Sequence, residues 1–235
     1  MTQSNDSRKR RWNLVAEGFA AFCERWPRYR ILAEHGIARL GDLTDSKILD
    51  IGCGVGDSTR VLAEHGKDVV AVDFSPKCIE YAKARIQRAN VAFEVEDAGV
   101  FLKRCSAQFQ QFDVIFCNAV IWQLENIEEF LKLAANVTAP GGRLLVNWCD
   151  KLTPLPLDFL ADRRGSSVDK LELALDNCGW VVSDIFEVEL KEQIETSSEF
   201  ISALGLRRPS TVVARQLSGG EYLVRTWTFV VGTKC

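Results

Sequence analysis

The stretch Ile48–Ser58, with the sequence ILDIGCGVGDS, places a short apolar run directly before three glycines at alternate positions. A short apolar run bounded by glycine is typical of a buried strand, and glycine lets the chain turn where other residues would clash. Such a turn after a buried strand is a common place for a nucleotide in α/β proteins. The spacing of Gly52, Gly54 and Gly56 indicates which nucleotide would fit.

The rest of the chain continues this alternation of strand and helix. Apolar runs predict strands at 47–51, 68–72, 91–95, 112–117 and 143–148. Segments with helical spacing lie between them, at 58–65, 76–88, 99–108 and 127–137. Alternating strands and helices imply βαβ units and a largely parallel sheet that is covered on both faces. The residues Pro140-Gly141-Gly142 predict a turn that leads into the fifth strand.

Both ends of the chain differ from this pattern. Aromatic residues at helical spacing predict helices from Trp12 to Leu40, interrupted at Pro27. Towards the other end, the pattern predicts a loop at 149–166, a helix at 167–178, and an antiparallel pair of strands at 180–190 and 222–232. The segment between these two strands, in which 199–206 could form a short helix, is too long for a hairpin turn and is expected to act as a lid.

Composition narrows the class of protein. The chain has 235 residues, 47% of them hydrophobic and 26% charged, as in a single globular domain. A net charge of −3 gives no overall attraction to nucleic acid or to anionic membranes. Eight scattered cysteines and two histidines, without a C-x-x-C pair, predict neither a zinc site nor a redox site. Without an apolar leader or spanning segment, the expected location is the cytoplasm, with reduced thiols.

One basic tract runs from Arg8 to Arg11. A nucleic-acid-binding arm is one interpretation, but the tract is short and isolated. A solvated, frayed chain end is therefore the favoured prediction.

Two common nucleotide motifs do not fit the glycine turn. The dinucleotide fingerprint G-x-G-x-x-G requires a third glycine where this chain has Asp57. A phosphate-binding P-loop requires glycine followed by lysine and a serine or threonine, and the sequence has no such run.

Asp50 together with G-x-G-x-G resembles motif I of the class I S-adenosylmethionine-dependent methyltransferases. The resemblance runs from about residue 47 to 148, and the β-rich C-terminal runs also fit. It implies a seven-stranded, mostly parallel, Rossmann-like sheet with an antiparallel last strand and helices on both faces. The implied single domain, 1–235, has an N-terminal helical cover at 1–44 and a cofactor-binding core at 45–150. Its C-terminal strands, at 151–235, carry a substrate-side insertion at 192–220.

The resemblance implies S-adenosylmethionine as cofactor, and the residues suit that ligand. Alternating glycines let the backbone approach the cofactor, and an acid such as Asp50 is a suitable neighbour for its cationic groups. Asp73 would accept hydrogen bonds from the ribose with Phe74 beside the adenine, and Asp97 would accept from the adenine amino group. Cys53 is expected to make a backbone contact. The expected cofactor-binding residues are Asp50, Gly52, Cys53, Gly54, Asp73, Phe74, Ser75, Asp97, Ala98 and Asn118.

Several features bear on the methyl acceptor. Asn118 is followed by Ala119-Val120 rather than by Pro-Pro and an aromatic residue, so the signature of amino-methylating nucleic-acid and protein enzymes is missing. Cys117 and Asn118 make a poor site for a hard cation, and no metal is expected. In-line methyl transfer needs alignment and exclusion of water more than a dedicated catalytic residue, and none is predicted. His35 and His65 lie in predicted helices and are not expected to act as bases.

The sequence therefore predicts an enzyme that moves a methyl group to O or N, with C as a further option, of a small-molecule acceptor. Trp12, Trp26 and Trp122 are expected to line the acceptor, with burial in the core as the alternative for each. A protein or RNA methyltransferase, and a protein of the same fold that binds the cofactor without methyl transfer, are the competing hypotheses. The acceptor, the methylated atom and the oligomeric state stay open.

Overall fold

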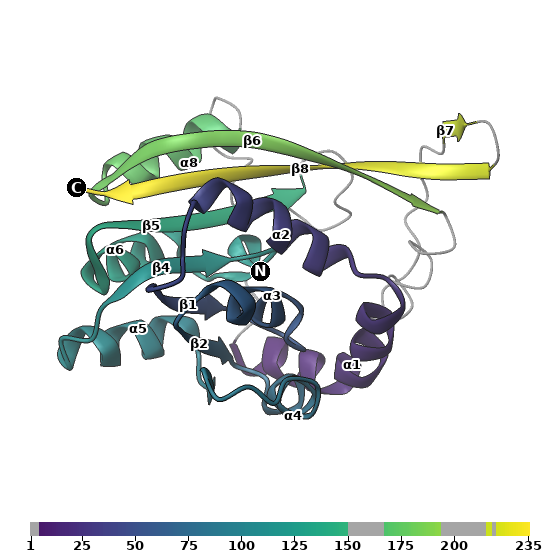
Figure 1. The fold of residues 1–235 in the computed structure, drawn as a ribbon, viewed down its shortest axis with the longest axis horizontal. Coiled ribbons are helices and arrows are strands. Elements are labelled where there is room, and N and C mark those ends of the chain that lie inside the picture. Colours follow the sequence, from purple (N-terminus) through teal and green to yellow (C-terminus); the bar gives the residue numbers. More distant parts are fainter. Residues whose placement is uncertain (1–4, 150–166, 194–214, 218–219) are drawn as a thin grey trace.

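The computed structural model describes residues 5–149, 167–193, 215–217 and 220–235, which form one sheet with helices on both faces (Figure 1). The strands are β1 Lys47–Ile51, β2 Asp68–Asp73, β3 Val91–Val95, β4 Phe112–Cys117, β5 Thr138–Cys149, β6 Trp180–Gln193, β7 Arg215–Leu217 and β8 Gly220–Lys234. Their order is β3-β2-β1-β4-β5-β8-β6, and β7 pairs with β8. The first five strands pair in parallel, and β8 is antiparallel to both β5 and β6.

The helices divide between the two faces of the sheet. They are α1 Asn5–Arg25, α2 Arg28–Leu40, α3 Asp57–His65, α4 Pro76–Arg85, α5 Ala98–Ala107, α6 Ile127–Asn136, α8 Ser167–Asp176 and the short 3₁₀ helix η1 Ile121–Gln123. Apolar side chains of α5, α6 and α8 pack in one buried cluster, and those of α2 and α3 pack in another. Side chains of the central strands β1, β2, β4 and β5 fill both clusters, because successive residues of a strand point to opposite faces. The centre of the sheet is therefore buried on both faces, while the edge strand β3 is largely exposed.

Local signals fix where the helices after β2 and β3 begin. The Ser75 hydroxyl accepts a hydrogen bond from the Cys78 N–H at 3.2 Å, and Pro76 occupies the first turn of α4. Asp97 accepts from the N–H groups of Gly99 and Val100 and caps α5. Both caps satisfy backbone donors that a helix start otherwise leaves without partners. They also place Ser75 and Asp97 directly after strands, at the carboxyl edge of the sheet.

The fold class predicted from the sequence is confirmed, including the antiparallel last strand β8, and the three-residue β7 is a strand beyond the seven predicted. The residues 47–51, 91–95 and 112–117 are strands with the predicted bounds. The fifth strand was predicted too short: β5 already begins at Thr138, and the predicted turn is a bulge inside it. Its pairing with β4 shifts between Phe112 and Val114, and Gly141 in the extra segment has a φ of +73°. The division of the domain at residues 44 and 150 stays a prediction.

The prediction of a frayed basic end is wrong, because Arg8 to Arg11 lie inside α1. The Arg8 guanidinium forms an ion pair with Glu125 at 2.7 Å. The start of α1 is therefore held in place by a residue that lies 117 positions later in the sequence. The expected loop at 149–166, apart from residue 149, and the expected short helix at 199–206 lie outside the described residues. None of the helices in the described ranges is long and apolar enough to cross a membrane.

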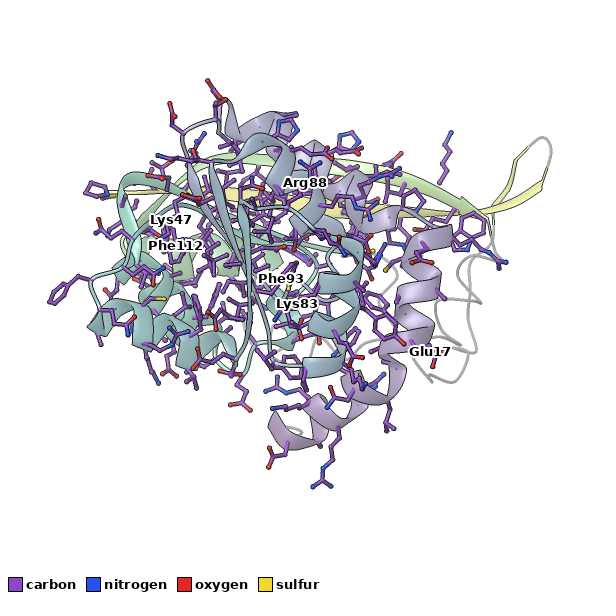
Figure 2. The ribbon with its side chains drawn as sticks, turned by 60° about the horizontal axis from the view of Figure 1, so that its bottom comes forward. Glu17, Lys47, Lys83, Arg88, Phe93 and Phe112 are labelled. Atoms are coloured by element: carbon purple, nitrogen blue, oxygen red, sulfur yellow. The ribbon has the colours of Figure 1, made fainter. Side chains whose placement is uncertain are left out.

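The position of α1 is what relates the fold to a site. Figure 1 shows α1 beyond the carboxyl ends of β1 and β2, and the helix packs against α4. Figure 2 shows Glu17 of α1 at one end of the molecule and Lys47 and Phe112, where β1 and β4 begin, towards the other. In open α/β sheets, ligands bind outside the carboxyl ends of the strands. Helix α1 therefore covers the edge at which a ligand is expected.

Candidate functional site

The glycine turn that follows β1 has a backbone that only glycine adopts easily. Gly52, Gly54 and Gly56 have φ values of +67°, +53° and +94°. A Cβ on Gly52 would lie 2.5 Å from the Val120 side chain, and one on Gly56 would lie 2.7 Å from Ile86. A Cβ on Gly54 would have an atom of the Phe19 ring of α1 as its nearest neighbour, at 3.6 Å. Gly54 is thus the glycine of this turn that faces the covering helix.

Backbone bonds hold this turn against the end of β2. The N–H groups of Gly52 and Cys53 both donate to the Val72 carbonyl, at 2.8 and 3.1 Å. The Cys53 side chain is buried, and burial raises the pKa of its thiol. Cys53 therefore enters the site through its backbone, and its thiol is not a reactive group.

Asp73 ends β2 and ties the glycine turn to the start of α4. One of its carboxylate oxygens accepts from the Gly54 N–H at 3.0 Å, and the other accepts from the Ser75 N–H at 2.8 Å. Burial raises the pKa of Asp73 to about 6, and the two backbone bonds oppose that rise. Phe74, the next residue, is half-buried.

Asp50 is the last residue but one of β1, directly before the glycine turn, and is 1% exposed. Its carboxylate accepts a hydrogen bond from the Thr59 hydroxyl at 2.6 Å. Burial raises the pKa of Asp50 to about 7, the Thr59 bond lowers it, and the charge of Asp73 raises it further. A buried carboxyl group of this kind binds a cation strongly when ionised, because water does not screen it.

Asn118 follows β4 and joins three other elements. Its amide nitrogen donates to the Tyr29 carbonyl at 2.9 Å and to the Ser58 hydroxyl at 2.8 Å. Its oxygen accepts from the Asn147 amide at 2.7 Å. These bonds hold the ends of β4 and β5 against α2 and α3. The protein itself thus provides partners for the Asn118 side chain, and a contact with the cofactor stays a prediction.

The predicted residues Asp97 and Ala98 lie after β3, two strands from the glycine turn in the order of the sheet. One oxygen of the Asp97 side chain accepts from the Gly99 N–H at 2.9 Å and from the Val100 N–H at 3.3 Å. Both Asp97 and Ala98 are half-buried. The ends of β1, β2 and β3 together carry nine of the ten expected cofactor residues, and Asn118 lies after β4.

The polar contacts that hold helix α1 across this edge include one at η1 and one after β2. The Trp12 indole N–H donates at 2.8 Å to the side chain of Gln123, the last residue of η1. The Asn13 side chain accepts from the Ser75 hydroxyl at 2.7 Å, after β2. The helix therefore bridges the segments that follow β2 and β4. Its apolar side packs against the glycine turn and α4, and Trp26 is partly buried against the same cluster.

A chain of aromatic rings runs from α1 towards β8. The Phe19 ring lies 5.2 Å from Trp12 and 5.7 Å from Tyr29, between ring centroids. The Trp227 ring lies 6.3 Å from Tyr29 and 6.2 Å from Trp122. The structure thus brings Trp12 and Trp122 to the same edge, and their contact with an acceptor stays a prediction. Sequence reasoning missed Trp227, although its alternation with Phe229 in an apolar run is the signal of a buried strand face.

Sequence reasoning also missed a buried ionic group. Glu192, which is 8% exposed, accepts hydrogen bonds from Arg28 at 2.6 Å and from Arg225 at 3.0 Å. These bonds connect the start of α2 with β6 and β8. His35 and His65 are both exposed. No group of three or more potential metal ligands lies together within the ranges that the structure describes.

Residues 43–202 match a protein family described as a methyltransferase domain. The ubiquinone biosynthesis O-methyltransferase of Coxiella burnetii is 33% identical over 104 residues, which are 43% of this chain and 43% of that protein. The demethylmenaquinone methyltransferase of Tropheryma whipplei is 34% identical over 108 residues, which are 46% of this chain and 43% of that protein. The similarity thus spans less than half the length of these curated relatives.

A solved structure extends the likeness of the fold to the whole chain. It is a complex from Haloferax volcanii between the Trm112 methyltransferase activator and a methyltransferase, and its matched chain has a TM-score of 0.67 at 16% identity. The match covers 100% of this chain and 99% of that one. Family match, sheet order and glycine turn together show that this chain belongs to the class I S-adenosylmethionine-dependent methyltransferases.

Proposed function

We propose that this protein transfers a methyl group from S-adenosylmethionine to O or N, with C as a further option, of a small-molecule acceptor. The observation that carries the proposal is the glycine turn at Gly52–Gly56, which is bonded to Asp73 and covered by α1. S-adenosylmethionine supplies the methyl group as part of a sulfonium. Such transfer is accelerated by alignment of the two partners and by exclusion of water.

The residues at the ends of β1 to β4 suit this cofactor. The Asp50 carboxylate would offset the positive charge of the amino group or the sulfonium, and buried charge makes that attraction stronger. The Asp73 oxygens accept one backbone N–H each and have capacity left for the ribose hydroxyls. Phe74 and Asp97 would flank and bind the adenine. The backbone at Gly54 would approach the cofactor closely, since it has no side chain of its own.

The acceptor side is supported by the aromatic residues. Trp12 lies on α1 and donates to Gln123, the residue that follows Trp122 in η1, and Trp26 packs against the same cluster as α1. Aromatic side chains form large apolar walls with few rotamers to fix. Two relatives are named for ubiquinone biosynthesis and for demethylmenaquinone, and both names support a small-molecule acceptor here.

The decisive experiment is methyl transfer from S-adenosylmethionine with a labelled methyl group. The protein is incubated with a cell extract separated into small molecules, proteins and RNA, with Asp73→Ala as the matched inactive control. We expect label in the small-molecule fraction only. Label in the protein or RNA fraction would show that the acceptor is a protein or an RNA rather than a small molecule. Binding of S-adenosylhomocysteine without label in any fraction would favour a binding protein without transfer activity.

A further inference from the structure

Two tryptophans at the covered edge, the partly buried Trp122 and the buried Trp227, have indole N–H groups without a partner in the described residues. Within the described part of the chain, neither Trp122 Nε1 nor Trp227 Nε1 has a hydrogen-bond partner, and both nitrogens are buried. The whole Trp227 residue is only 4% exposed. By contrast, the N–H of Trp12 donates to Gln123 at 2.8 Å, and that of Trp180 donates to the Leu131 carbonyl at 3.0 Å. The pair is thus exceptional among neighbours of the same type.

A buried donor without a partner opposes folding, because it has lost its bonds to water. Buried tryptophan N–H groups usually find an acceptor. One such group could be a packing compromise, but here two belong to neighbouring rings whose centroids are 6.2 Å apart. Two donors on adjoining rings suit a ligand oxygen, which can accept both bonds at once.

The position of the pair indicates which ligand would bring that oxygen. Trp122 follows β4. Val120, two residues earlier, packs against Gly52 so closely that a Cβ on that glycine would lie 2.5 Å from the Val120 side chain. Trp227 pairs in register with Cys149, near the carboxyl end of β5. The expected ribose and adenine contacts lie on the other side of β1, at the ends of β2 and β3. The two indoles therefore lie near the ends of β4 and β5, away from the expected ribose and adenine contacts, where the acceptor would bind.

We infer that Trp122 and Trp227 bind the methyl acceptor by donating their indole N–H groups to one of its oxygens. This inference rests on the proposed function and narrows its substrate class. The oxygen belongs to a carboxylate, a carbonyl or a phenol, because an indole N–H only donates and an ammonium group offers it no acceptor. The centroid of the Trp227 ring lies 6.3 Å from that of Tyr29 and 6.2 Å from that of Trp122. The flat faces of these three rings favour a planar acceptor.

The test uses ¹⁵N-labelled full-length protein saturated with S-adenosylhomocysteine. The chain has six tryptophans, and their indole N–H signals are assigned with Trp122→Phe and Trp227→Phe. Benzoate and acetophenone are the oxygen-bearing probes, and benzylamine is the matched cationic probe without an acceptor oxygen. We expect benzoate or acetophenone to move the Trp122 and Trp227 signals downfield and to leave the Trp180 signal unchanged. Benzylamine should move neither of the pair.

Affinity and stability measurements separate binding from packing. Each of the two substitutions should weaken benzoate binding about tenfold, the value of one hydrogen bond, while the affinity for S-adenosylhomocysteine is retained. Trp180→Phe, which loses a formed bond in the core, should lower the melting temperature more than Trp227→Phe and should not change benzoate binding.

Three outcomes would overturn the inference. The first is that no oxygen-bearing probe moves the two signals while S-adenosylhomocysteine is bound. The second is that S-adenosylhomocysteine alone moves both signals to their hydrogen-bonded positions, which would assign the pair to the cofactor. The third is that both signals are already at hydrogen-bonded positions in the free protein. If S-adenosylhomocysteine does not bind at all, the proposed function itself has failed.

Discussion

Asp73 combines a structural and a proposed binding role in a single carboxylate. Its oxygens already hold the N–H groups of Gly54 and Ser75, so both roles depend on the same side chain. Asp73→Ala should weaken binding of S-adenosylhomocysteine by about 1.5–3 kcal/mol for each ribose bond lost, because bonds to charged groups are the stronger ones. Calorimetry measures the affinity, and circular dichroism checks the fold.

A second variant separates the two roles of Asp73. Asp73→Asn keeps the size of the side chain and one acceptor oxygen, so the turn should stay closer to its native geometry. The exposed Asp45→Asn is the control for loss of a charge. Native affinity in Asp73→Asn and Asp73→Ala alike, with native spectra, would contradict the ribose assignment.

The raised pKa of Asp50, at about 7, makes cofactor binding depend on pH. A cation next to this carboxyl group favours its ionised form, so below the pKa a proton must leave when the cofactor binds. The affinity for S-adenosylmethionine should therefore fall as the pH drops below about 7, by up to about tenfold per pH unit. Calorimetry between pH 5.5 and 8 measures it. Asp50→Asn should bind weakly and with a flatter profile, in which Asp73, with a pKa of about 6, still titrates.

The same two carboxyls should affect stability in the opposite direction when no ligand is bound. Their folded-state pKa values, about 7 for Asp50 and about 6 for Asp73, lie above the value of about 3.9 for an aspartate in an unfolded chain. Between these values the folded state binds more protons, so the free energy of unfolding should fall as the pH rises from about 4 to 7. Urea unfolding of the free protein measures this. Asp50→Asn should lose part of the slope.

At the scale of elements, the central strands and the glycine turn could be predicted because their signals are local. An apolar run bounded by glycine fixed β1 and its turn, and Ser75-Pro76 fixed the start of α4. The start of α1 could not be predicted, because Arg8 is held by Glu125, 117 residues away in the sequence. The Arg28–Glu192 pair spans 164 residues, and only the completed sheet brings these two charges together.

That buried ion pair stabilises the junction of α2 with β6 and β8. Glu192→Gln would leave two guanidinium groups without their shared carboxylate, and breaking a buried pair in this way costs about 3–5 kcal/mol. The exposed pair Arg30–Glu34 on α2 supplies the control, because Glu34→Gln should cost no more than about 0.5 kcal/mol. Urea unfolding compares the two variants. Equal losses would show that the buried pair is no stronger than a surface contact.

Helix α1 is expected to act as a cover rather than as a part of the sheet core. Removal of residues 1–27 should abolish turnover more than it unfolds the sheet, because water then reaches the carboxyl edge. Cofactor binding should quench tryptophan fluorescence, since Trp12 lies on this helix and Trp26 follows it directly. An insoluble or molten truncated protein would show that the helix only fills the core. A soluble truncated protein with native turnover would contradict the cover.

A milder change tests the same cover without exposing its apolar side. Asn13→Ala removes the bond to Ser75 while the helix itself is kept. The control is Leu14→Ala, because Leu14 is 84% exposed and its loss should leave the position of α1 unchanged. Asn13→Ala should lower turnover more than this control. Steady-state kinetics compares the two variants. Equal effects would show that the bond does not fasten α1.

At the scale of the whole molecule, the sheet order explains why distant residues form one site. The strands β2, β1, β4 and β5 lie side by side and in parallel, so their carboxyl ends meet at one edge. The glycine turn, Asp73 and Asn118 come from three of these ends. Strand β8 runs the other way beside β5 and brings Trp227 to this same edge. The site is therefore a product of topology as much as of motif.

A ligand that binds this edge should stabilise the entire domain. It links the ends of several strands to α1, and a ligand that binds only the folded state raises the free energy of unfolding by mass action. At 100 times its Kd, S-adenosylhomocysteine should add about 2.7 kcal/mol, which is about 5–11 °C in Tm for a chain of this size. NAD should give no shift, because Asp57 stands where its fingerprint requires glycine. Thermal unfolding with each ligand measures both. The Asp73→Ala variant should show a smaller shift with S-adenosylhomocysteine than the native protein. A shift with NAD and none with S-adenosylhomocysteine would show that the glycine turn binds a dinucleotide instead.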